Sequence, residues 1–186
     1  PKGVETMERA QRNGYDLLAR VNHWVAAVGF MGALGLGLVM AYGGLDREAV
    51  GGLMDWHKAL GVFVFAFGLW RVGWRILQGF AADHLSTPVW QRRIARGVHI
   101  ALLAAILLMP LSGILMTVAG SRELQVFGMT LLPSLGEIAW LDALADWMHG
   151  TLGLFITGVL ALHIIAGLKH LWLRVAREDE PMAQQI

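Results

Sequence analysis

Four long apolar segments constrain this 186-residue chain more than any other feature of its sequence. They span residues 21–42, 57–77, 98–118 and 147–173. Each is close to the roughly 20 residues that an α-helix needs to cross the hydrocarbon core of a bilayer. Hydrophobic residues make up 56% of the chain and charged residues only 16%, a balance too apolar for an ordinary soluble domain. The sequence therefore predicts an all-α integral membrane protein folded as a four-helix bundle.

Lysines and arginines are distributed unevenly between the two sides of this predicted bundle. The side that includes both termini has twelve of them and the opposite side has three. The twelve are Lys2, Arg9, Arg12, Arg20, Arg71, Arg75, Arg92, Arg93, Arg96, Lys169, Arg174 and Arg177, and the three are Arg47, Lys58 and Arg122. Cytoplasmic loops carry an excess of such cations. We therefore expect both termini in the cytoplasm.

These assignments divide the chain into three parts. Residues 1–20 are expected to form a polar or interfacial cytoplasmic head, residues 21–175 the four-span membrane domain, and residues 176–186 a cytoplasmic tail. The connector at residues 124–141, LQVFGMTLLPSLGEIAWL, is semi-apolar. It is expected to lie on the outer membrane surface, either as an amphipathic lid or as an interfacial helix without further function.

Four histidines fall into two layers when their depth in the membrane is worked out. His57 and His149 open the second and fourth segments at the outer side, whereas His23 opens the first segment at the cytoplasmic side. His163 follows His149 by fourteen residues, which places it about 21 Å farther along the same helix and only about 40° around it. Outer His57 can therefore pair with His149, and inner His23 with His163, each pair drawn from two helices.

Paired histidines inside an apolar bundle are suited to the iron of haem. Neutral imidazole is a good axial ligand, and the core of a helix bundle can hold the macrocycle. The chain has no cysteine, which excludes thiolate ligands and covalent haem attachment through C-x-x-C-H. The four histidines thus predict two b haems with bis-histidine ligation, and the second ring nitrogen of each ligand should donate to a backbone carbonyl or other acceptor.

The residues that follow these histidines support the choice. Side chains on a helix lean toward its N-terminus, so the residue at i+4 crowds the space over residue i, where a porphyrin needs room. The residues four positions after His23, His57, His149 and His163 are Ala27, Gly61, Gly153 and Gly167, all of them small.

Two arginines fit the same scheme. Arg71 lies fourteen residues after His57 and therefore on nearly the same helix face, at the cytoplasmic end. Arg71 and Arg75 would reach the inner haem, and a guanidinium group is suited to a haem propionate. The alternative is that both arginines only extend to the membrane boundary as cationic anchors.

The other histidines have weaker interpretations. His99 begins the third segment at the inner surface, where it could line the inner haem, help to form a quinone site, or simply lie at the interface. His170 is on the same helical face as His163 and is its main competitor as an inner ligand. His84 lies in a polar connector and is expected to be solvated.

The order and spacing of these motifs resemble the bacterial cytochrome b561 family, within the group that includes the b-type cytochrome subunits of nickel-iron hydrogenases. YDLLARVNHW resembles the family's first helix with its haem histidine, and WHKALGVFVFAFGLWRVGWR its second helix with a leading histidine and two arginines. GVHIALLAAILLMPLSGILM is similar to its third helix, VFGMTLLP to its outer connector, and WMHGTLGLFITGVLALHIIAGLKH to its fourth helix. The matching residues are His23, His57, Arg71, Arg75, His99, Pro110, His149 and His163.

This resemblance implies a di-haem b-type cytochrome of the bacterial inner membrane that carries electrons across it to or from ubiquinone. In at least some members of the family the donor is superoxide. The outer connectors here carry three cations and seven acidic residues, which weighs against an anionic substrate. The expected partners are membrane lipid, a quinone and an unidentified one-electron donor or membrane or periplasmic redox protein, but no nucleic acid.

Two alternatives remain open at this point. The chain could be the membrane-anchor cytochrome of a dehydrogenase or hydrogenase and receive electrons from a partner subunit. In a different class of function, its histidines could line a path for metal-ion transport. A metal path predicts further ligands within the spans between the two histidine layers, and the sequence places no carboxylate there.

Overall fold

The computed structural model describes the backbone of residues 2–78 and 88–178, and the side chains of residues 17–77 and 88–173. Within these residues the chain forms four α-helices. They are α1 (Lys2–Tyr42), α2 (Arg47–Gln78), α3 (Val89–Ala119) and α4 (Ala139–Glu178). All four contain a stretch that is long and apolar enough to cross a membrane. The predicted four-span helical architecture is therefore confirmed, and the chain is a multi-pass membrane protein.

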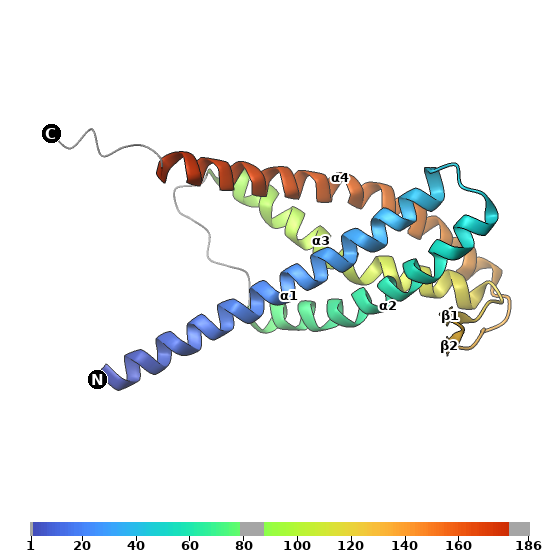
Figure 1. Cartoon of the computed structure of the whole chain (residues 1–186), viewed down its shortest axis with the longest axis horizontal. Coiled ribbons are helices and arrows are strands. Elements are labelled where there is room, and N and C mark those ends of the chain that lie inside the picture. Colours follow the sequence, from blue (N-terminus) through green and yellow to red (C-terminus); the bar gives the residue numbers. More distant parts are fainter. Residues whose placement is uncertain (1, 79–87, 179–186) are drawn as a thin grey trace.

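The helices run alternately up and down, so that the start of α1 and the end of α4 lie at one end of the bundle (Figure 1). We call this the terminal end, and the opposite end, which carries two short strands, the hairpin end. Helix α1 packs along α2 and α3 packs along α4, while contacts between α2 and α3 join the two pairs. The pairs diverge toward the terminal end (Figure 1).

The helices extend beyond the predicted spans. Helix α1 continues without a break from Lys2, so the expected boundary at residue 20 falls inside a helix. Helix α4 begins at Ala139 and reaches Glu178, beyond the expected start of the tail at residue 176. The division into head, membrane domain and tail stays a prediction, and residues 179–186 lie outside the described part of the chain.

The connector between α3 and α4 forms a β-hairpin rather than an interfacial helix over its first half. Strands β1 (Leu124–Val126) and β2 (Met129–Leu132) pair antiparallel. The two turn residues, Phe127 and Gly128, have φ angles of 48° and 78°, as a type I′ turn requires. Leu124 and Val126 are buried, and β1 contacts both α2 and α3. The hairpin excludes one of the two alternatives for this connector, the interfacial helix, over residues 124–132. Its position on the outer membrane surface stays a prediction.

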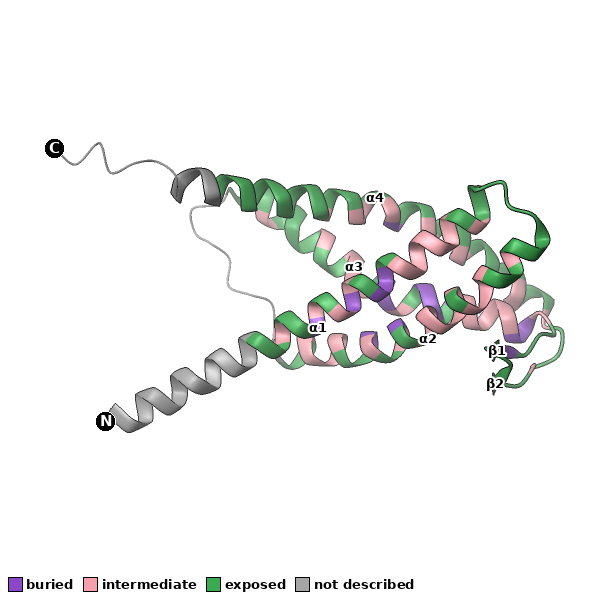
Figure 2. Ribbon diagram, in the orientation of Figure 1, coloured by how far each residue is buried: buried purple, intermediate pink, exposed green. Residues whose placement is uncertain are grey.

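The core of the bundle lies midway between its ends. Its buried members are Ala26, Phe30, Val64, Ala105, Ile106, Met109 and Ile156, with at least one from every helix. Figure 2 shows this buried zone in the middle, with more exposed residues toward the terminal end. Gly29 and Gly68 allow close packing, because a Cβ on Gly68 would lie 3.0 Å from the carbonyl oxygen of Ile106. Pro110 leaves that carbonyl without its usual helical donor.

Candidate functional site

The structure brings together five of the predicted site histidines in two groups. At the hairpin end, the ring centroids of His57 and His149 are 6.0 Å apart, with an angle of 87° between the ring planes. At the terminal end, His163 faces two other imidazoles. Its ring centroid is 6.3 Å from that of His23 and 5.6 Å from that of His99. Each facing pair comes from two different helices, as the depth argument predicted.

His57 is oriented by the helix beside it. Its Nδ1 atom donates to the backbone carbonyl of Ala33 on α1, at 2.9 Å. A carbonyl oxygen can only accept, so the proton of the neutral ring is on Nδ1 and the lone pair is on Nε2. A Cβ on Gly37 would lie 3.2 Å from His57 Cε1, so the absence of a side chain there makes room for the ring.

His149 is held in the same way by α3. Its Nδ1 atom lies 3.0 Å from the carbonyl oxygen of Met109 and 3.0 Å from Ser112 Oγ. Ser112 itself donates to the Met109 carbonyl at 2.8 Å, so its oxygen accepts from the imidazole. A Cβ on Gly113 would lie 3.1 Å from His149 Cε1. This imidazole therefore also presents an unprotonated Nε2.

The two hairpin-end histidines share one arrangement. Each faces a neighbouring helix that offers a carbonyl at position i and a glycine at position i+4, namely Ala33 with Gly37 and Met109 with Gly113. Because the side chain at i+4 covers the space over residue i, only a glycine there lets an imidazole reach the carbonyl. The expected acceptor for the second ring nitrogen is therefore confirmed for both residues.

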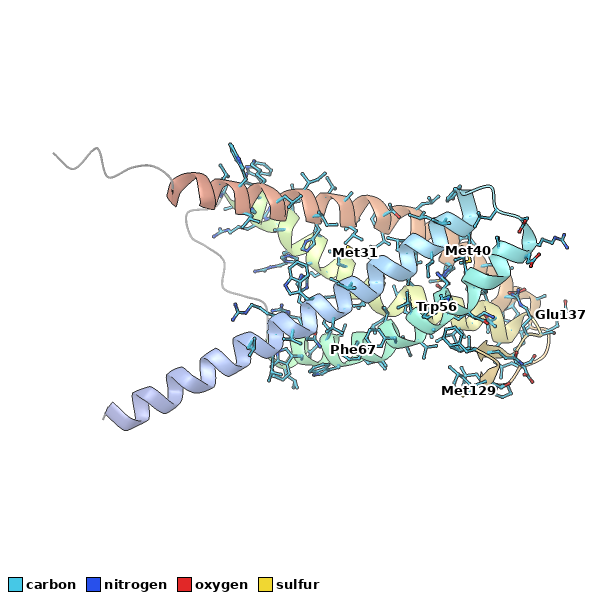
Figure 3. All side chains as sticks on the ribbon, viewed as in Figure 1. Met31, Met40, Trp56, Phe67, Met129 and Glu137 are labelled. Atoms are coloured by element: carbon cyan, nitrogen blue, oxygen red, sulfur yellow. The ribbon has the colours of Figure 1, made fainter. Side chains whose placement is uncertain are left out.

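A cavity of about 410 Å³ adjoins these two imidazoles, with walls from all four helices and β1. Gly61 and Gly153, the small residues expected to leave room over the histidines, both line it. Lys58 supplies a charged group to walls that are otherwise mostly apolar. Met40 on α1, which lines the cavity, and Trp56 on α2 mark this end of the bundle in Figure 3.

At the terminal end, a side chain rather than a backbone carbonyl contacts the Nδ1 atom of a histidine. Arg71 Nη2 lies 3.0 Å from His23 Nδ1, and Arg71 Nη1 donates to Asn22 Oδ1, also at 3.0 Å. A guanidinium group has no acceptor, so His23 Nδ1 must accept and the ring proton is on Nε2. That tautomer is the opposite of the one at His57 and His149. His99, in contrast to His23, is an exposed residue.

The other predicted residues lie around this group. Arg75 is half-buried, one helical turn beyond Arg71 at the terminal end of α2. His170 is exposed on α4 and takes part in none of the ring contacts found among residues 17–77 and 88–173. His84 lies outside the described residues.

The spacing of the imidazoles provides a test for haem iron. A metal–imidazole bond is about 2.0–2.1 Å long, and the nitrogen is about 1.1 Å from its ring centroid, so two rings across one iron have centroids about 6.2–6.4 Å apart. The pairs His57–His149 at 6.0 Å and His23–His163 at 6.3 Å come close to this spacing. His99 is closer to His163, at 5.6 Å. By centroid spacing, each end of the bundle therefore has room for one iron between two imidazoles.

No group of three or more histidine, cysteine or acidic side chains in the described residues is arranged to hold a metal ion by itself. Facing imidazoles from two helices of an apolar bundle are an arrangement typical of membrane cytochromes, in which such pairs ligate haem iron.

Comparison with known proteins assigns the family. The family model for prokaryotic cytochrome b561 matches residues 14–177. Cytochrome b561 homolog 2 of Escherichia coli (strain K12) is 27% identical over 163 residues, covering 84% of each chain. The chain belongs to the prokaryotic cytochrome b561 family. It is accordingly a b-type cytochrome that binds haem b and transfers electrons across the membrane.

Proposed function

We propose that the chain holds two b haems, one at each end of the bundle, and transfers electrons across the membrane between a one-electron donor and the ubiquinone pool. His57 and His149 ligate the haem at the hairpin end, and His23 and His163 the haem at the terminal end. When bound, each haem supplies a one-electron redox centre with both axial positions filled.

The observation that carries this proposal is the repetition of one imidazole spacing at two depths. Facing pairs at 6.0 and 6.3 Å come from different helices at each end. On α4, His149 and His163 are about 21 Å apart by helical rise. In this scheme the protein binds the haems, orients them and keeps water away from them. The hydrophobic cluster between the two pairs is suited to excluding water.

Arg71 and Arg75 are proposed to bind propionates of the terminal-end haem. Arg71 is close to His23, and both of its acceptors in the structure, Asn22 Oδ1 and His23 Nδ1, are neutral groups. A half-buried guanidinium group with neutral acceptors is suited to a carboxylate ligand. His99 is proposed to contact this haem or a quinone rather than to ligate iron, because its spacing from His163 is the shorter one.

We propose that the terminal end faces the cytoplasm of a bacterial inner membrane. The twelve lysines and arginines on that side, against three on the other, support this orientation. The link to ubiquinone is supported by the family. The acidic balance of the connectors at the hairpin end weighs against superoxide as the donor.

The test is the haem stoichiometry of the detergent-purified protein by the pyridine haemochrome method, followed by spectra recorded after adding ubiquinol and, separately, superoxide. Two b haems per chain, reduced by ubiquinol, are the expected result. One haem per chain would overturn the two-site scheme. Two haems that only a partner dehydrogenase or hydrogenase reduces would replace the quinone assignment with that of a membrane-anchor subunit.

The metal-transport alternative is less well supported. The buried cluster midway between the two histidine groups is made of hydrophobic side chains. A path for hydrated or ligand-bound cations needs polar groups at intermediate depth.

A further inference from the structure

Asn22 is a buried polar residue with half of its side chain unpaired. It lies in the membrane-spanning part of α1 and is 3% exposed. Its Oδ1 atom accepts a hydrogen bond from Arg71 Nη1 at 3.0 Å. Its Nδ2 atom is buried and has no hydrogen-bond partner among the described residues.

Such a group requires an explanation. An unsatisfied buried amide loses its hydrogen bonds to water without replacement, and native proteins leave few of them. The local charge favours an anionic partner, because Arg71 is cationic and its two acceptors are neutral. An amide N–H and a guanidinium side by side, both lacking an anionic acceptor, are together suited to a carboxylate.

We propose that Asn22 Nδ2 donates a hydrogen bond to a propionate of the terminal-end haem, and that Asn22 and Arg71 together form the binding site for this carboxylate. This inference rests on the proposed function, since it requires a haem at the terminal end. Asn22 has two tasks in it, because its Oδ1 orients Arg71 while its Nδ2 contacts the ligand.

The proposal also explains how His23 can change from the tautomer seen here to the one that ligates iron. To ligate iron through Nε2, this imidazole must carry its proton on Nδ1, where Arg71 now donates. A carboxylate that draws the guanidinium toward itself releases Nδ1 and allows the ring to change tautomer. Binding of the propionate and ligation by His23 are then coupled through Arg71.

Two substitutions separate the two tasks of Asn22. Asn22→Asp keeps an acceptor for Arg71 but replaces the N–H donor with a carboxylate that repels a propionate. Asn22→Leu removes both functions without adding charge. If Asn22 donates to the propionate, release of the terminal-end haem should be at least tenfold faster in Asn22→Asp than in the unmodified protein, and faster than in Asn22→Leu.

The measurement is the rate of haem transfer from the purified holoprotein to apomyoglobin at pH 8, where the introduced aspartate is ionised. The phase that disappears in His163→Ala is assigned to the terminal-end haem. The hairpin-end phase serves as the internal control for folding and should keep its rate in every Asn22 variant. Asn22→Ser, whose hydroxyl can still donate, should fall between Asn22→Asp and the unmodified protein.

A release rate for Asn22→Asp within twofold of the unmodified protein would overturn the proposal and reduce Asn22 to a residue that orients Arg71. So would an Asn22→Asp protein that retains haem better than Asn22→Leu. The proposed function fails separately, through a different observation: the unmodified protein itself would lack the second haem phase.

Discussion

Both ends of the bundle bring imidazoles from different helices together, but different hydrogen-bond partners orient the rings at the two ends. At the hairpin end, carbonyl acceptors hold both rings with Nε2 free, and glycines on the facing helices make room for them. At the terminal end, an arginine donates to His23, and His163 faces two imidazoles rather than one. In the proposed scheme, the imidazoles of the first site are thus arranged for a haem in advance, whereas at the second the haem propionate completes the arrangement.

This difference between the two ends follows from the kind of hydrogen-bond partner that each histidine has, a backbone carbonyl or an arginine side chain. Backbone carbonyls are fixed by the helix and accept only, so they determine the tautomer without any bound group. A long arginine side chain can move between acceptors, and its charge is best satisfied by an anion. The same contrast predicts that the hairpin-end haem is more sensitive to packing and the terminal-end haem to charge.

Removal of a ligand should have the largest effect at either end. His149→Ala should abolish the hairpin-end haem and His163→Ala the terminal-end haem, because each change removes one of the two facing imidazoles at that end. Pyridine haemochrome analysis should give about half the haem of the unmodified protein in both cases. His170→Ala is the control and should keep both haems. Loss of haem in His170→Ala, with retention in His163→Ala, would reassign the ligand at the terminal end.

The second-largest loss of haem is expected when the space beside an imidazole is filled. Gly37→Val places a branched side chain where even a Cβ lies 3.2 Å from His57 Cε1. The ring should be displaced from the Ala33 carbonyl, and most of the hairpin-end haem should be lost while the terminal-end haem stays. Gly35→Val is the matched control, since a Cβ there meets nothing within 4 Å. Equal haem contents in the two variants would contradict the idea of a packed, arranged site.

A smaller effect is expected from removing one of the two acceptors of His149. Ser112→Ala leaves the Met109 carbonyl in place, so the tautomer of the ring should be kept. Partners of metal-ligating histidines typically contribute about 10–100-fold to affinity, and we expect the lower end of this range, about tenfold. Haem transfer to apomyoglobin should show faster release from the hairpin end only. A change confined to the terminal-end phase would contradict the assignment of the two sites.

The smallest effect concerns the hairpin itself. Gln125 and Thr130 donate to Glu123 Oε2 at 2.9 and 3.0 Å, and these hydrogen bonds lower the pKa of the Glu123 carboxyl below its ordinary value of 4.5. A lowered pKa stabilises the hairpin above the ordinary value, and this contribution is lost as the pH falls through the lowered one.

Thr130→Val should therefore raise the pKa of Glu123 toward 4.5, as measured by NMR titration of the carboxyl carbon. Haem content should not change, because Glu123 is a surface residue of the connector. An unchanged pKa would show that Gln125 alone determines it.

The sequence was sufficient to predict the four spans and the pairing of His57 with His149. Hydropathy identifies a membrane helix reliably, and helical rise and azimuth place residues of one helix relative to each other. The spacing of residues within the helix of each histidine does not point to Gly37 and Gly113, because these glycines belong to the facing helices. Their role depends on which helix lies opposite, and this information is absent from a local pattern.

The hairpin turn and the contacts of Arg71 could not be predicted from sequence patterns either. The turn at Phe127 and Gly128 lacks the Asn-Gly or Asp-Gly pair that usually indicates a hairpin. The contact of Arg71 with both Asn22 and His23 depends on the relative rotation of α1 and α2. Hydrophobic periodicity shows which face of a helix is apolar, but it does not fix the register between two apolar faces.

The apolar middle of the bundle has a consequence for energy conversion. Its buried side chains, from Ala26 and Phe30 to Ile156, have no group that can take up or release a proton. In the proposed two-haem scheme an electron crosses this layer from one haem to the other. A membrane potential of 100 mV changes the free energy of such a charge movement by about 2.3 kcal/mol for a full crossing. In that scheme the voltage across the membrane favours electron flow in one direction over the other.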